Sequence, residues 1–203
     1  MPKSPIYPGT VDWSGENPGM YLKESADGPF VTLISFFRVV LSPYGRGTAL
    51  LMLRSPAEAN PPAAKSNLCI TDNEPLARYL VTNFAGAFGS FKGQAGLEGV
   101  AYRKMTGGGT SGDAASSYVE TVSAAGLDVR LAWEGLDAPF AFELPVEKSA
   151  TGKHVMLTVF VSAERASATV NGQPLPGRPV PRDMLGRPMT TAFLAFSETW
   201  IKA

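Results

Sequence analysis

The side chains with the clearest capacity for chemistry are charged residues that stand inside strand-like segments. In each segment the residues alternate, so that the charge falls on one face of a strand and apolar residues fall on the other. In a sheet with one solvated face this is ordinary patterning, whereas in a barrel the same charges could line a cavity. The charged residues concerned are Arg38, Glu120, Arg130, Glu134, Glu143 and Glu198.

Charges and aromatic residues of these strands together predict a ligand site. Two basic and two acidic residues are the candidates to orient a polar group of the ligand, and aromatic residues, including Phe193 and Phe196, would supply apolar walls. No catalytic residue can be named from the sequence. The predicted ligand-binding residues are Arg38, Glu120, Arg130, Trp133, Glu198 and Phe142.

Metal and cofactor chemistry finds little support in the residue types. His154 is the sole histidine and Cys69 the sole cysteine, which excludes multi-histidine sites and any intrachain disulfide. No carboxylate stands at a fixed spacing from His154, so we interpret it as a strand-edge residue rather than a catalytic base. The phosphate-binding loop, the nucleophile elbow, C-x-x-C and H-E-x-x-H are all missing from the sequence. We predict neither a metal nor a cofactor.

One glycine-rich segment resembles a dinucleotide-binding turn in its spacing alone. Gly107, Gly109 and Gly112 satisfy G-x-G-x-x-G and precede a segment, 114–125, that could form a helix. However, the strand before them carries Arg103 and Lys104, where a parallel strand covered on both sides should be apolar. The pattern is therefore weak evidence for a nucleotide site.

The residues after the glycines favour a hairpin instead. Tyr118 and Val122 prefer strand to helix, because their χ1 restriction costs little on a pleated surface. We predict a glycine loop over 106–113, followed by a strand over 117–124 that pairs antiparallel with 127–134.

Length and composition favour one folded domain over 1–203. The chain holds 18 acidic and 18 basic residues, and its net charge of zero disfavours nonspecific binding to nucleic acid or to an anionic membrane. No apolar run reaches the roughly 20 residues of a membrane helix. The first residues, about 1–19, are broken by Pro and Gly and are expected to form an irregular arm without a secretory signal, which gives a cytoplasmic expectation.

A single helix is predicted, over 72–88. Leu76, Leu80 and Phe84 recur at helical spacing and form an apolar stripe that a sheet must cover. Asn73 and Asp72 can cap its first turn, where Pro75 is tolerated. The helix should therefore pack on a sheet.

Most of the remaining chain alternates with a period of two. The run 30–41 is apolar on both faces and predicts a central strand, and five or six consecutive antiparallel strands are expected in the last third. The proline-rich run 174–188 is expected to hold no regular structure. These patterns predict a mainly β (α+β) fold, an antiparallel barrel or strongly bent sheet with one principal helix; the alternative is a two-sheet sandwich.

Three functions are compatible with this sequence. The first is a barrel that binds a small, partly apolar molecule in an internal cavity. The second is an enzyme of the cyclase, isomerase, lyase or hydrolase type that uses a carboxylate and an arginine in that cavity. The third is a homo-oligomeric structural or interaction protein without a ligand. A homodimer is expected in each case, because long apolar terminal strands such as 191–200 must be covered.

Overall fold

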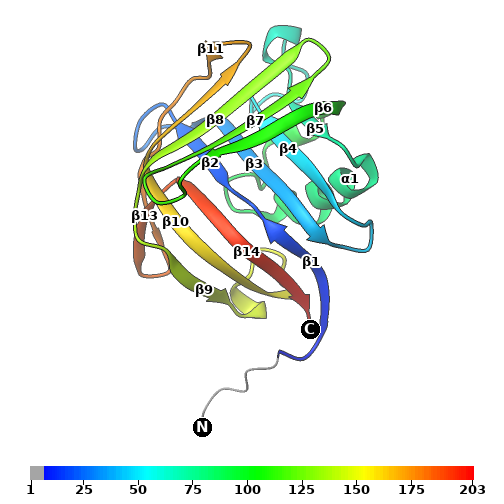
Figure 1. Ribbon diagram of the computed structural model, residues 1–203, viewed down its shortest axis with the longest axis vertical. Coiled ribbons are helices and arrows are strands. Elements are labelled where there is room, and N and C mark those ends of the chain that lie inside the picture. The colour runs from blue at the N-terminus through cyan, green and yellow to red at the C-terminus, as the bar shows by residue number, and fades with distance from the viewer. Residues whose placement is uncertain (1–6) are drawn as a thin grey trace.

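Alternation of apolar and polar residues produces strands along most of the chain. The computed structural model describes residues 7–203 and contains a closed nine-stranded β-barrel with one principal helix, as predicted (Figure 1). The strands are β1 (Thr10–Glu16), β2 (Gly19–Lys23), β3 (Phe30–Leu41), β4 (Gly47–Leu53), β5 (Leu68–Thr71), β6 (Ala101–Gly112), β7 (Ser117–Ala124), β8 (Leu127–Leu136), β9 (Phe140–Leu144), β10 (His154–Val170), β11 (Gln173–Pro174), β12 (Pro181–Met184), β13 (Arg187–Thr190) and β14 (Ala192–Lys202).

The barrel closes because β10 and β14 each pair with neighbours on both edges, and some of these neighbours are far away in the sequence. β10 pairs with β8 on one side and β14 on the other, and β14 returns to β1 and β2. β1 and β2 lie end to end between β14 and β3, and each of them pairs with both. Asn17 and Pro18 separate the two short strands. Proline has no N–H to give to a ladder, so the pairing is interrupted at this point.

Two hydrophobic clusters lie on the two faces of the barrel wall. The inner cluster draws side chains from strands all round the barrel, including Ile34, Leu131 and Leu194, and fills its interior. The outer cluster joins β1, β3, β10 and β14 to the covering helix through Trp13, Phe37 and other residues. Both faces of the central strand β3 are therefore buried, as its sequence predicts.

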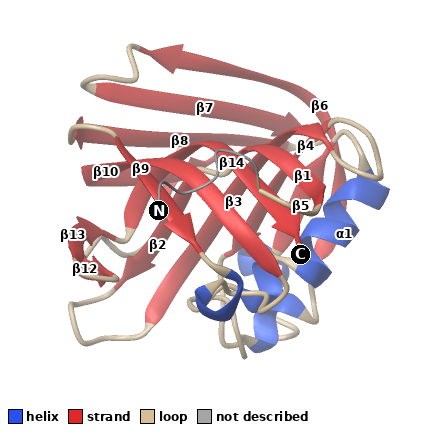
Figure 2. Ribbon diagram, turned by 90° about the horizontal axis from the view of Figure 1, so that it is seen from below, coloured by secondary structure: helices blue, strands red, loops and turns tan. Residues whose placement is uncertain are grey.

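Helix α1 (Glu74–Asn83) lies against the outside of the barrel beside β4 and β5 (Figures 1 and 2). It buries Leu76 and Leu80, and the Asn73 side chain accepts a hydrogen bond from the N–H of Leu76, as expected of an N-cap. The helix ends before the predicted residue 88, because the chain turns at Phe84 into short 3₁₀ turns. None of the helices in residues 7–203 is long and apolar enough to cross a membrane.

The crossover that contains α1 makes one strand pair parallel. β5 and β6 run in the same direction, since a connection through a helix returns the chain to the starting edge of the sheet. The other pairs of the barrel are antiparallel within the described residues. The otherwise antiparallel barrel thus contains one parallel strand pair, β5 with β6.

Three segments that were expected to be irregular are strands. The arm 1–19 contains β1, which is held between β14 and β3; its residues 1–6 lie outside the described part. The glycine loop 106–113 is the second half of β6, paired with β7, and the hairpin of β7 and β8 is confirmed. The proline-rich run 174–188 contains β12, which forms a hairpin with β13. A strand is possible in this run because Pro181 is the first residue of β12, a position at which proline is tolerated.

Candidate functional site

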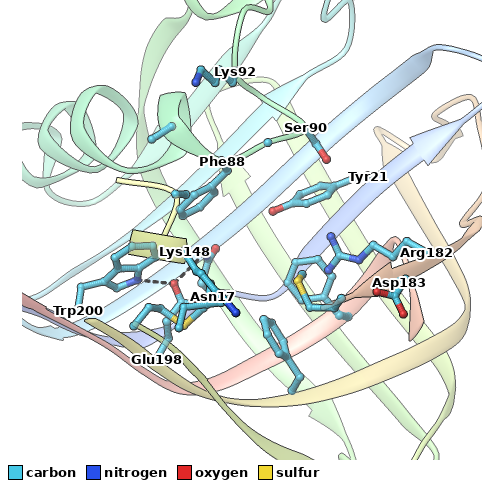
Figure 3. Close-up of a pocket in the computed structure, with 18 residues that line it drawn as sticks. Asn17, Tyr21, Phe88, Ser90, Lys92, Lys148, Arg182, Asp183, Glu198 and Trp200 are labelled. Carbon is cyan, nitrogen blue, oxygen red and sulfur yellow. Dashed lines mark hydrogen bonds between the residues drawn. The ribbon is translucent and has the colours of Figure 1, made fainter. Parts of the chain in front are cut away.

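A cavity of about 530 Å³ lies on the outer face of the barrel wall. Its floor is formed by side chains of β2, β10 and β14, and its walls by residues 87–92, by the segment 144–150 and by the β12–β13 hairpin (Figure 3). The inner cluster occupies the barrel itself, so this cavity is not the internal one that the sequence predicts. Residues of the cavity used below are Asn17, Tyr21, Phe88, Arg182, Phe193, Glu198 and Trp200.

Glu198 supplies a buried carboxyl group to this cavity. Its side chain is 3% exposed, and its Oε1 accepts hydrogen bonds from Nε1 of Trp200 at 2.7 Å and from Nδ2 of Asn17 at 3.4 Å. Within residues 7–203 its Oε2 has no hydrogen-bond partner, yet it is not a fully buried atom, so it borders the cavity. Burial raises the pKa of Glu198 from its ordinary value of 4.5 to about 7, although both hydrogen bonds lower it.

A β-bulge turns Glu198 toward the cavity. The register between β10 and β14 shifts between Leu157 and Val159, where β14 holds one extra residue. Ser197 in this bulge has a φ of 52°, a left-handed conformation that is uncommon for residues other than glycine. Such local strain is characteristic of functional sites, where it re-aims a side chain.

Asn17 holds the carboxyl group from the break between β1 and β2. Its Oδ1 accepts a 2.6 Å hydrogen bond from Oγ of Ser35, which fixes the amide so that Nδ2 faces Glu198. Ser35 and Asn17 are both buried. The orientation of Glu198 is therefore determined by a chain of buried hydrogen bonds.

Arg182 brings a cation to the same cavity from β12. Its guanidinium lies over the ring of Phe193 at 4.7 Å and over that of Tyr21 at 5.8 Å. No carboxylate of residues 7–203 forms an ion pair with it, and its buried Nε has no acceptor. Burial lowers the pKa of Arg182, whose charge is thus only partly compensated.

Tyr21 brings a phenol to the same cavity. Burial raises the pKa of the Tyr21 hydroxyl, and the charges of Arg182 and Glu198 both act on it, in opposite directions. The hydroxyl points into the cavity (Figure 3). It remains protonated at neutral pH and can donate a hydrogen bond to an oxygen atom of a ligand.

Four aromatic rings contribute to the rest of the cavity surface, beside aliphatic side chains and the charged Lys92, Lys148 and Asp183. The rings of Phe88 and Trp200 stack with centroids 5.8 Å apart, and Phe193 packs edge-on against Tyr21 and Phe160. Aromatic walls with a few converging polar groups are typical of sites for small molecules.

The predicted site residues are divided among several places. Arg38 and Glu120 meet at one end of the barrel, where their ion pair measures 2.6 Å and Glu120 is 1% exposed. Arg38 also pairs with Glu16 at 2.6 Å, and Tyr118 donates a hydrogen bond to Glu120. One guanidinium thus bridges two carboxylates at the barrel mouth.

The other predicted residues lie elsewhere on the barrel. Trp133 is buried in the barrel interior, where its indole N–H donates to the carbonyl of Gly19, and Arg130 is exposed on β8. Phe142 packs on Phe160, a residue of the cavity floor, without lining the cavity itself. Among the six predicted ligand-binding residues Glu198 alone lines the cavity, together with Phe193, which was predicted as an apolar wall.

Sequence reasoning missed Arg182, Tyr21, Asn17 and Trp200. Arg182 stands among prolines, in a segment where no strand was expected. The sequence Asn17-Pro18, at which strand pairing must break, is a signal that could have identified Asn17. The bulge at Ser197 carries no comparable sequence signal.

His154 begins β10 and makes a second buried network on the outer face. Its Nε2 lies 2.8 Å from Oδ2 of Asp12, and its Nδ1 lies 2.8 Å from the hydroxyl of Thr151. Asp12 also accepts a hydrogen bond from Tyr79 of α1. The carboxylate partner of His154 thus comes from β1, a pairing that no sequence spacing could reveal.

Chemically, the cavity offers the guanidinium of Arg182, a phenol and a carboxyl group of raised pKa beside apolar walls, and Lys92, Lys148 and Asp183 add further charges to its lining. Within residues 7–203 no group of three or more His, Cys, Asp or Glu residues is arranged to hold a metal ion. No protein-family model, curated protein or solved structure matches the chain.

Proposed function

We propose that this protein binds a small, partly apolar molecule with an anionic group, such as a carboxylate, in the cavity on the outer face of the barrel. The observation that carries the proposal is the guanidinium of Arg182, which borders the cavity without an ion-pair partner among the described residues. A half-buried cation without a counter-ion is costly for the folded protein, and an anionic ligand would compensate it.

The aromatic walls support the partly apolar character of the ligand. Phe88, Phe193 and Trp200 offer ring surfaces close to the guanidinium, so a ligand with an apolar tail would bury that tail while its anionic group meets Arg182. The cavity volume of about 530 Å³ falls within the 300–1,000 Å³ typical of small-molecule sites.

Calorimetry with paired ligands tests this proposal. The carboxylates are 3-phenylpropionate, hexanoate and phenylpyruvate, and each is compared with its neutral amide. We expect at least one carboxylate to bind at least about tenfold more tightly than its amide, because an ion pair in a desolvated site contributes well over 1 kcal/mol. If no carboxylate binds at millimolar concentration, or if the amides bind equally well, the proposal is wrong.

Two substitutions in the β12–β13 hairpin show whether Arg182 causes the preference for the carboxylate over its amide. Arg182→Gln should abolish the preference for the carboxylate. Arg187→Gln is the matched control, since Arg187 stands on the neighbouring strand and lies over Phe140 at 3.9 Å, outside the cavity lining. Equal effects of the two substitutions would indicate a general electrostatic attraction instead of a site.

A further inference from the structure

We propose that this cavity catalyses proton transfer on its ligand, and that the ligand is a small 2-oxo carboxylic acid with an apolar tail. The inference rests on the proposed function, because it takes Arg182 as the partner of the carboxylate. It adds Glu198 as the catalytic residue that moves the proton and Tyr21 as the donor to the reacting oxygen.

Three groups of one cavity match the three polar positions of this substrate. Arg182, Tyr21 and Glu198 all line the cavity, and the guanidinium of Arg182 lies over the Tyr21 ring at 5.8 Å from its centroid (Figure 3). A 2-oxo acid carries its carboxylate, its carbonyl oxygen and the acidic C–H on three successive carbon atoms. The carboxylate would meet Arg182, the carbonyl oxygen Tyr21, and the C–H bond Glu198.

The proton transfer needs no further reactant. Oε2 of Glu198, which is free of protein hydrogen bonds in the described structure and borders the cavity, takes the proton from the carbon next to the carbonyl group. The C–H bond breaks, an O–H bond forms on Oε2, and the electron pair remains on the substrate as an enolate. Tyr21 donates a hydrogen bond to the enolate oxygen, and return of the proton to carbon or oxygen completes an exchange or a tautomerisation.

The environment of Glu198 fits a base that works near neutral pH. Burial raises its pKa to about 7, the range in which a carboxyl group both accepts and returns a proton efficiently. Trp200 and Asn17 bond only to Oε1, which leaves the other oxygen directed at the ligand. These two residues are positioning residues, and the bulge at Ser197 supplies the backbone turn.

Hydrogen exchange into deuterated water measures this reaction directly. Phenylpyruvate and 4-methyl-2-oxopentanoate are the probes, and proton NMR follows the loss of the signal of the CH₂ group beside the carbonyl. We expect the protein to accelerate exchange over buffer, Glu198→Gln to slow it about 100-fold or more, and Tyr21→Phe to slow it by about 100-fold. Glu134→Gln, which changes an exposed acid on β8, should leave the rate unchanged.

Binding and exchange are measured on the same samples, so that the two proposals fail separately. A probe that binds in calorimetry and exchanges no faster than in buffer overturns the proton-transfer proposal and leaves the binding proposal standing. Absence of binding by every carboxylate overturns the proposed function itself. Exchange that persists in Glu198→Gln, with the variant folded by circular dichroism, removes Glu198 from the role of base.

The pH profile distinguishes a base from a purely structural carboxyl group. The exchange rate at low probe concentration should rise with pH and level off above about 7, because only the ionised form of Glu198 accepts a proton. Trp200→Phe removes a hydrogen bond that lowers this pKa, so the midpoint should move to higher pH. A lower rate with an unmoved midpoint would contradict the role of Trp200 as a positioning residue for the base.

Discussion

Phe196 and Glu198, two residues apart on β14, lie on opposite faces of the barrel wall. Strict alternation would place both on one face, yet Phe196 packs against the inner cluster while Glu198 lines the outer cavity. The extra residue of the β14 bulge separates them, with Ser197 in the left-handed region. One backbone irregularity thus decides which compartment receives the carboxyl group.

The bulge predicts an unusual order of stabilities at position 197. Ser197→Gly should be as stable as the natural protein or more so, and Ser197→Val should be less stable by about 2 kcal/mol, because a β-branched residue is strained at positive φ. Urea denaturation measures the free energy of unfolding. Ser167→Val is the control, since Ser167 is exposed on β10 in ordinary strand conformation and valine should cost nothing there. Equal effects at the two positions would contradict the bulge geometry.

Burial of Glu198 predicts that the protein loses stability as the pH rises. The pKa is raised on folding from 4.5 to about 7, so the folded state keeps a proton that the unfolded state releases. Relative to Glu198→Gln, the natural protein should lose stability as the pH rises from about 4.5 through about 7, by at most about 3.4 kcal/mol at about 1.36 kcal/mol per pKa unit. Urea denaturation at pH 5 and pH 8 checks this. A difference between the two proteins that is constant with pH would show that Glu198 is not buried in this way.

The ion pair at the barrel mouth predicts a strong asymmetry between single and double substitutions. Arg38→Met should destabilise the fold by about 3 kcal/mol, because it leaves the buried carboxylate of Glu120 without its cation. The double variant with Glu120→Gln should recover at least half of that loss in urea denaturation. Glu74→Gln, which breaks the exposed pair with Arg78, should cost no more than about 0.5 kcal/mol. Simple additivity of the two barrel-mouth substitutions would show that the pair is not coupled.

The hydrogen bonds of Asp12, which join β1 to α1 and β10, should stabilise the folded protein. Asp12→Ala removes the acceptor of Tyr79 and the partner of His154, and should cost about 2 kcal/mol of unfolding free energy because both polar groups lose their bond. Tyr44→Phe is the control, since the ring of Tyr44 lies 4.9 Å from that of Tyr79 but its hydroxyl makes no hydrogen bond with residues 7–203. Thermal unfolding of the two variants should differ clearly; equal midpoints would contradict the prediction.

The sequence pattern was sufficient to predict the secondary structure of segments whose own residues determine it. The alternation of Leu127, Val129 and Leu131 predicted β8, and the stripe of Leu76 and Leu80 predicted the helix, because burial of one face is what forms these elements. Pattern failed for the glycines around Gly108, which become a strand because β7 offers a ladder to their backbone. Propensity is a weak guide wherever such a partner exists.

The sequence by itself determined a mainly β chain with one amphipathic helix and a few charges embedded in strands, since period-two and helical spacing are local properties. Only the tertiary structure decided which charges meet. Arg38 and Glu120 neutralise one another across the barrel, whereas Glu198 and Arg182 are brought to one cavity by a bulge and a proline-bounded hairpin. Those contacts depend on long-range register and on a single positive φ, and neither leaves a periodic trace in the order of the residues.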